Sequence, residues 1–154
     1  MSAYYFDSSA LVKYYGQEVG TKWVHGLIDA QPANEIFTAL LTGVEIVAAI
    51  KRRERMNLIT PSDAGAALAV FRNQFRSRFK AFRTSDVVVD RAMNLAEAHK
   101  LRGYDAIQLA SALLIEERMT AQGVGPLTLI SADDEMNHAA EAEGLLTDDP
   151  NQHA

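Results

Sequence analysis

The apolar positions of this chain repeat with two different periods. Short apolar runs, bounded by polar or turn-forming residues, predict β-strands. The predicted strands cover residues 3–6, 35–38, 80–82, 127–131 and 145–147. Longer segments between them repeat apolar residues at helical spacing and predict helices over residues 9–15, 21–30, 41–55, 61–79, 87–101, 105–121 and 133–143. Strands that alternate with helices indicate an α/β fold with a parallel sheet covered on both faces.

Capping residues mark some of the predicted helix ends. The stretch Thr60-Pro61-Ser62-Asp63 offers an N-cap, a proline at the first helical position and an acidic first turn. Gly103 is expected to close the helix before it. Parallel sheets of this kind place ligand sites at the carboxyl ends of their strands, so we look for chemistry there.

The length and composition indicate one globular domain. The chain has 154 residues, of which 48% are hydrophobic and 23% charged. No repeat or linker divides it, so we assign residues 1–147 to a single domain and expect the polar tail, residues 148–154, to fray.

Two absences narrow the class of protein. There is no cysteine, which excludes disulfides, thiolate nucleophiles and cysteine-bound zinc, and which suits a reducing compartment. We find neither a signal peptide nor an apolar run of membrane-spanning length, so we expect a cytoplasmic protein with no membrane partner.

The charge is distributed unevenly along the sequence. The net charge is -5, yet residues 51–102 contain twelve Lys or Arg and five Asp or Glu. This basic middle segment is either a solvated helix face or a surface that contacts phosphates, and the sequence alone leaves both readings open.

Acidic residues follow two of the predicted strands directly. Asp7 comes after the apolar run YYF, and Asp133 ends the segment LTLISAD. Each begins a helix, so a helix N-cap is the alternative role for either residue. Asp134 adjoins Asp133 and points in a different direction, and we rank it second.

Two further acids lie on predicted helices. Glu45 is expected on an inward face with Leu41, Val44 and Ala48, where a carboxylate needs a cation or a buried salt bridge. Asp105 opens the helix DAIQLASALLIEE, and a helix cap is again its alternative role. If the fold brings these acids into one crevice, their mutual repulsion requires neutralisation by cations. Oxygen ligands select hard ions, chiefly Mg²⁺ or Mn²⁺.

Four segments carrying these acids resemble the acidic motifs of the PIN domain, in particular of the VapC type. The segments are YYFDSSALVKYY, TGVEIVAAIKR, HKLRGYDAIQLASAL and LISADDEM. The resemblance covers nearly the whole chain and implies a three-layer α/β/α fold with sheet order 3-2-1-4-5. It also implies metal-dependent endoribonuclease activity.

Carried over position by position, the resemblance makes Asp7, Glu45, Asp105 and Asp133 the catalytic metal ligands, with Glu45 binding directly or through water. Ser9 matches a hydroxyl residue that contacts the metal water or the phosphate. Ser131 stands where threonine is more usual. Glu18 resembles a glutamate common in VapC sequences, and a solvent-facing loop acid is its alternative role.

The resemblance further implies an RNA substrate, an antitoxin protein similar to VapB that covers the site, and a homodimer. Apolar helices in the N-terminal half also favour the homodimer. In such a site the metal, as one ion or two, activates water for attack on phosphorus. Among the four histidines, none neighbours a proposed ligand in sequence, and His99 is the one worth testing.

Other classes of protein fit less well. A phosphatase with Asp7 as nucleophile usually needs a second aspartate two residues later, where this chain has Ser9. A receiver-like domain would pair its acids near the first strand, whereas these acids are spread over four motifs. An RNA-processing nuclease or an inactive scaffold with the same fold remains an alternative to the toxin.

Overall fold

A computed structural model describes all 154 residues and contains a five-stranded parallel sheet. The strands are β1 (Ser2–Phe6), β2 (Asn34–Ala39), β3 (Lys80–Phe82), β4 (Leu127–Ile130) and β5 (Leu146–Asp148). Their order, β3-β2-β1-β4-β5, confirms the predicted topology. The first strand therefore lies at the centre, between β2, the next strand in the chain, and β4, which comes much later. No helix is long and apolar enough to cross a membrane.

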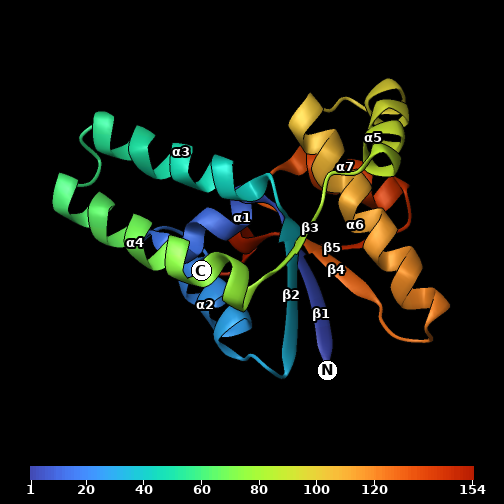
Figure 1. Ribbon diagram of the computed structural model, residues 1–154, viewed down its shortest axis with the longest axis horizontal. Coiled ribbons are helices and arrows are strands. Elements are labelled where there is room, and N and C mark those ends of the chain that lie inside the picture. Colours follow the sequence, from blue (N-terminus) through green and yellow to red (C-terminus); the bar gives the residue numbers. More distant parts are fainter.

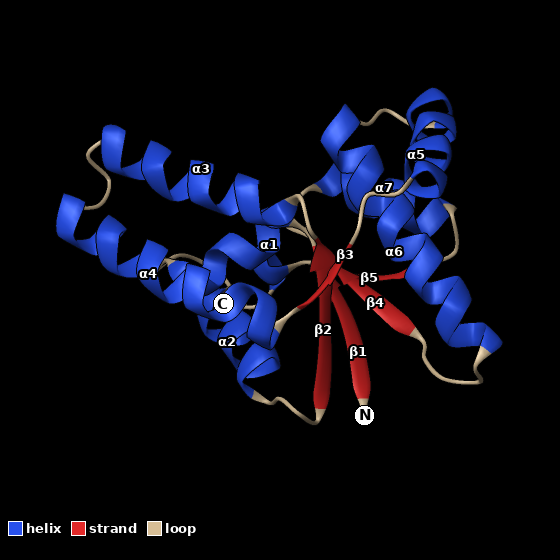
Figure 2. Cartoon of the chain, in the orientation of Figure 1, coloured by secondary structure: helices blue, strands red, loops and turns tan.

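Helices cover both faces of the sheet (Figures 1 and 2). One layer holds α1 (Ser8–Leu11), η1 (Val12–Tyr15), α2 (Thr21–Asp29), α3 (Thr42–Arg55) and α4 (Pro61–Arg78). The other layer holds α5 (Asp86–Ala98), α6 (Gly103–Ala121) and α7 (Asp134–Ala142). A short helix, η2 (Pro150–Gln152), follows the last strand. The three-layer arrangement predicted from the sequence is confirmed.

The alternation of side chains along the strands builds two separate cores. Tyr5 and Leu129 point into the core beneath α5, α6 and α7, whereas Phe6 and Ile130 point into the core beneath α1 to α4. All four side chains are fully buried. Because both faces of the central strands are covered, these strands read as nearly continuous apolar runs.

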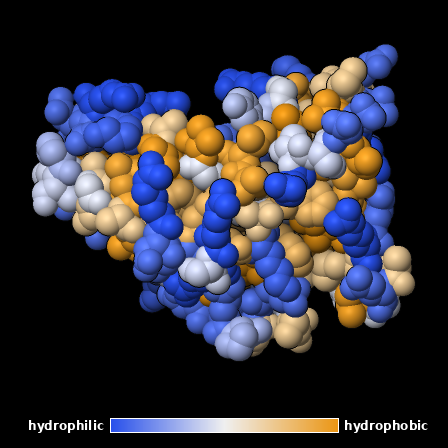
Figure 3. Space-filling model, viewed as in Figure 1, coloured by the Kyte–Doolittle hydropathy of each residue, from blue (hydrophilic) through white to orange (hydrophobic).

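Helices α3 and α4 form a long hairpin that projects from the sheet (Figure 1). Gly43 lets the hairpin close at its base, since a Cβ there would lie 2.8 Å from the Phe75 ring. The space-filling view shows hydrophobic surface on this face, crossed by hydrophilic side chains (Figure 3).

Two details of the structure differ from the sequence predictions. The helix α5 ends at Ala98, and Gly103 begins α6 instead of closing the helix before it. The reason is that residues near His99 and Arg102 adopt extended backbone and separate the two helices. The strands and helices otherwise follow one another along the chain in the predicted order.

The C-terminal tail, expected to fray, is packed against α2. The ring of His153 stacks on Trp23 with centroids 4.0 Å apart, and Pro150 is buried. Gly20, with a φ of 85°, permits this close approach, because a Cβ there would lie 2.4 Å from the Pro150 carbonyl oxygen. Aromatic stacking and close packing hold a polar segment that its composition alone marks as mobile.

Candidate active site

Asp7 lies at the carboxyl end of the central strand and is 3% exposed. Its Oδ1 atom accepts hydrogen bonds from the Ala10 backbone N–H at 3.0 Å and from the Ser9 hydroxyl at 2.6 Å. The Ser131 hydroxyl donates to Oδ2. Burial raises the pKa of Asp7 from 3.8 to about 6 against the opposing effect of these donors, and the charge of Asp105 adds to the rise.

The two serines connect the ends of two neighbouring strands. Ser131 follows β4, which pairs with β1, and its side-chain hydroxyl reaches the Asp7 carboxylate across that pairing. The Ser9 hydroxyl oxygen accepts a hydrogen bond from the Ala132 N–H at 2.9 Å, and the two hydroxyl oxygens lie 3.4 Å apart. Both hydroxyl residues singled out in the sequence therefore contact Asp7 directly.

Glu45 lies in the first turn of α3, beside the end of β1. Its Oε2 atom accepts a hydrogen bond from Ser8 at 3.0 Å, and its Oε1 atom accepts one from Gln108 at 2.9 Å. The face on which the sequence analysis placed it was wrong: Val44 is 65% exposed, and the buried side chains of α3 include Ile46 and Ile50. Glu45 reaches the crevice from the flank of the helix.

Asp105 is the third residue of α6 and is half-buried. Its alternative role as the N-cap is not what the structure has, because the N-cap position belongs to Arg102. Burial raises the pKa of Asp105, and the negative charges of Asp133 and Glu45 raise it further. Asp105 thus lies within electrostatic reach of acids from two other elements.

Asp133 caps α7. Its Oδ1 atom accepts hydrogen bonds from the backbone N–H groups of Glu135 at 2.9 Å and Met136 at 3.4 Å. The charge of Asp133 raises the pKa of Asp105. Asp134 is exposed at the first position of α7 and makes no contact with them.

Glu18 lies apart from this group. It forms ion pairs with Arg53 at 2.9 Å and with Lys13 at 3.9 Å. His99 is not hydrogen-bonded to any of these acids; its Nε2 atom lies 2.9 Å from a carboxylate oxygen of Glu143. Electrostatic interactions therefore link Asp105 with Asp7, Glu45 and Asp133, whereas Glu18 and His99 have partners elsewhere.

None of the four acids forms an ion pair. The ion pairs of the chain involve other residues, so the buried salt bridge considered for Glu45 is absent. Neutral donors hydrogen-bond to Asp7 and Glu45, and the charge of Arg102 lowers the pKa of Asp105 against the effect of burial and of the other acids. An oxygen donor set of this kind suits a hard divalent cation. With the side chains as they stand, no three acids or histidines are grouped closely enough to hold an ion. For Asp133, both capping hydrogen bonds go to Oδ1, which leaves Oδ2 to bind a metal.

The sequence analysis missed a buried network of hydrogen-bonded side chains centred on Gln108. Gln108, 2% exposed, contacts Tyr5, Thr42 and Glu45. The available signal was a long polar side chain between Ile107 and Leu109 on a helix that is otherwise apolar there. Buried polar groups of this kind must find partners, but the partners are too distant in sequence to be named.

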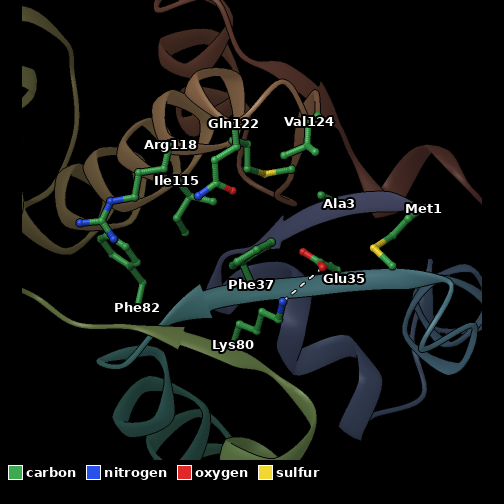
Figure 4. Close-up of a pocket in the computed structure, with 12 residues that line it drawn as sticks. Met1, Ala3, Glu35, Phe37, Lys80, Phe82, Ile115, Arg118, Gln122 and Val124 are labelled. Carbon is green, nitrogen blue, oxygen red and sulfur yellow. Dashed lines mark ion pairs between the residues drawn. The ribbon is translucent and has the colours of Figure 1, made fainter.

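Two cavities lie outside the acidic group. One, of about 460 Å³, is lined by Phe37, Phe82 and Arg118, with an ion pair between Glu35 and Lys80 at 3.2 Å (Figure 4). The other is a groove between α3 and α4, whose charged lining residues are all basic. They are Lys51, Arg55, Arg72 and Arg76. Neither cavity contains any of the four acids.

Comparison with known proteins assigns the chain to a family. Residues 4–142 match the PIN domain, so the protein belongs to the PIN-domain family. Two ribonucleases from different strains of Mycobacterium tuberculosis, VapC45 and VapC49, are each 33% identical to it over 115 residues. The alignments cover 75% of this chain and 78% of each relative. Within the family, the chain therefore belongs with the VapC ribonucleases.

Solved structures share the fold at low sequence identity. FitAB bound to a DNA fragment has a TM-score of 0.65 and 11% identity, and covers 96% of this chain and 94% of its own. Mycobacterium tuberculosis VapC20, a toxin that cleaves the sarcin–ricin loop, has a TM-score of 0.62 and 15% identity, with coverage of 93% and 96%. A toxin–antitoxin complex from Klebsiella pneumoniae has a TM-score of 0.57 and 22% identity, with coverage of 86% and 88%.

Proposed function

We propose that this protein is an endoribonuclease toxin of the VapC type that uses Mg²⁺ or Mn²⁺ held by Asp7, Glu45, Asp105 and Asp133. One observation carries the proposal: four carboxylates from separate parts of the chain, none of them in an ion pair, interact electrostatically around Asp105. Burial and the charges of Asp133 and Glu45 raise the pKa of Asp105, and the charge of Arg102 lowers it. A site of this composition is costly for folding alone and fits the neutralising charge of a metal ion.

The residues divide the work of the site by their positions. Bound there, the metal supplies positive charge to the attacking water and to the phosphate. Asp7, at the rigid end of β1, and Asp133, at the end of β4, are its main ligands, and Asp105 and Glu45 complete the set directly or through water. Ser9 and Ser131 fix the orientation of the Asp7 carboxylate by donating to its two oxygens.

The proposed substrate is RNA, and the basic groove between α3 and α4 supports it. Arg55, Arg72 and Arg76 form no ion pair, so their charges are available for phosphates. The groove is lined on the α3 side by residues of the same helix that carries Glu45. By contrast, Arg53 and Arg78 of the same basic segment are neutralised by Glu18 and Asp29.

The proposed protein partner is an antitoxin similar to VapB. It is supported by the structural neighbours, which include a toxin–antitoxin complex and a VapBC2 complex from Rickettsia felis. Co-expression with the product of a short adjacent reading frame should yield a complex in which RNA cleavage is inhibited. Cleavage that such a product leaves unchanged, with no complex on size exclusion, would favour an RNA-processing nuclease instead.

The metal requirement can be tested directly. Purified protein is incubated with total bacterial RNA in Mg²⁺, Mn²⁺ or EDTA, and the products are separated on a denaturing gel. We expect cleavage in either metal and none in EDTA, because the site offers only oxygen ligands. Full cleavage in EDTA would exclude the proposed mechanism.

A further inference from the structure

Gln108 links the acidic group to the core beneath α6. Its side chain lies one turn after Asp105 on α6 and reaches Glu45 on α3. The Nε2 atom lies 2.9 Å from Glu45 Oε1 and 2.9 Å from Thr42 Oγ1, and the Tyr5 hydroxyl lies 2.5 Å from Oε1. An amide with all three of these partners can orient a carboxylate, provided that it cannot flip.

The hydroxyl groups on the Nε2 side fix the direction of the hydrogen bonds. Thr38 Oγ1 lies 2.8 Å from the Phe6 carbonyl oxygen and 2.9 Å from Thr42 Oγ1. A hydroxyl has one proton and a carbonyl oxygen can only accept, so Thr38 donates to Phe6 and accepts from Thr42. Because the Thr42 O–H already donates to Thr38, the Thr42 oxygen can only accept in its contact with the Gln108 side chain. The atom of the Gln108 amide that faces Thr42 must therefore be the NH₂ nitrogen.

The Tyr5 contact agrees with the same orientation. Tyr5 is fully buried, and its hydroxyl donates a hydrogen bond to Oε1 of Gln108. Both ends therefore hold the amide in one orientation, and its second N–H faces Glu45.

We propose that Gln108 is a positioning residue, held in one orientation by Tyr5 and the Thr42–Thr38 hydroxyl pair, which aims the Glu45 carboxylate at the metal site. The inference rests on the proposed function, because it assigns to Glu45 a part in metal binding. It adds a residue that touches neither metal nor substrate and ties the ends of β1 and β2 to the acids of α3 and α6.

The test measures Mn²⁺ affinity by titration calorimetry on protein without RNA. Gln108→Met keeps the length of the side chain and removes both polar ends. We expect Mn²⁺ to bind about 10-fold to 100-fold more weakly, the usual effect of removing a group that orients a ligand. Tyr5→Phe leaves the amide held from one side only and should give a smaller loss. Wild-type Mn²⁺ affinity in both variants would overturn the inference.

A matched control separates positioning from general loss of packing. Gln74 on α4 also accepts a hydrogen bond from a phenol, that of Tyr15 at 3.2 Å, and has no acid of the site as a partner. Gln74→Met should leave Mn²⁺ affinity unchanged. Melting temperatures in EDTA report how far each substitution affects the fold itself.

A double-mutant cycle distinguishes action through Glu45 from an independent effect. In the Glu45→Gln background, Gln108→Met should weaken Mn²⁺ binding little further, because the group that Gln108 orients has already changed. Additive losses would overturn the inference. Asp7→Asn, measured alongside, tests the proposed function. Wild-type Mn²⁺ affinity and wild-type RNA cleavage in Asp7→Asn would contradict the proposed metal site. If Asp7→Asn loses both Mn²⁺ binding and cleavage while the Gln108 variants keep wild-type Mn²⁺ affinity, only the positioning role of Gln108 is contradicted.

Discussion

Asp7 caps a helix in the structure, and we propose that it also binds metal, two roles that its sequence position presents as alternatives. Its Oδ1 atom caps the short helix α1 by accepting a hydrogen bond from the Ala10 N–H. The charge of Asp105 also contributes to the raised pKa of the buried Asp7 carboxyl group. A cap needs only a hydrogen-bond acceptor, whereas a metal ligand needs negative charge. The two roles are therefore separable by a substitution that removes charge and preserves shape.

Asp7→Asn is expected to abolish cleavage while preserving the fold. Asparagine caps helices about as well as aspartate, so the start of α1 should survive. Removal of a direct ligand should reduce RNA cleavage by more than the roughly 10–100-fold typical of outer-shell changes. Denaturing gels and Mn²⁺ calorimetry measure these effects, with circular dichroism as the check on folding. Near-normal RNA cleavage by Asp7→Asn would contradict a role of Asp7 as metal ligand and would show that the residue serves only as a helix cap.

The raised pKa of Asp7 predicts a specific pH dependence in chelator. Because this pKa is about 6 in the folded protein and 3.8 ordinarily, the folded state binds more protons between about pH 4 and pH 6. The Asp7 contribution to the free energy of unfolding therefore falls as pH rises through that window, by about 3 kcal/mol at about 1.4 kcal/mol per pKa unit.

Urea unfolding of wild type and Asp7→Asn in EDTA at several pH values measures this contribution. The stability of the variant relative to wild type should rise by up to about 3 kcal/mol between pH 4 and pH 7, since asparagine does not titrate. A difference between the two proteins that stays constant over this range would mean that the carboxyl group titrates normally.

At the level of elements, periodicity predicted the strands and most helices, because each element carries its own apolar pattern. The boundary between α5 and α6 was misplaced, since the first residue of α6 follows Arg102, which provides no side-chain cap. The acids at the ends of β1 and β4 could be predicted from their positions after apolar runs. The contacts of Gln108 could not be predicted, because Tyr5 is 103 residues away in the sequence and no local sequence pattern indicates that the two side chains meet.

Two glycines on the α3–α4 hairpin should respond in opposite ways to alanine. At Gly43 the added Cβ would lie 2.8 Å from the Phe75 ring, so Gly43→Ala should destabilise the protein by about 1–3 kcal/mol. At Gly65, inside α4, the Cβ would meet nothing within 4 Å, and Gly65→Ala should stabilise by up to about 1 kcal/mol. Thermal and urea unfolding measure both. Equal effects would contradict the close packing at the hairpin base.

At the level of the whole molecule, we predict a homodimer. The prediction follows from the family resemblance, and both helix layers expose apolar side chains, such as Val44 on α3 and Met93 on α5, each 65% exposed. Light scattering coupled to size exclusion should give twice the mass of one chain at working concentration. A mass of 16.9 kDa, the value for a single chain, would contradict the prediction.

The strand order also determines when the acidic crevice can exist during synthesis. The central strand β1 is made first, but its neighbour β4 begins only at Leu127. Until the ribosome has passed that point, one edge of β1 lacks its hydrogen-bonding partner, and the crevice lacks Asp133. A nascent chain that ends within α6 therefore holds three of the four acids and an open sheet edge. We expect chaperones or proteases to recognise such an open edge before the acidic group is complete.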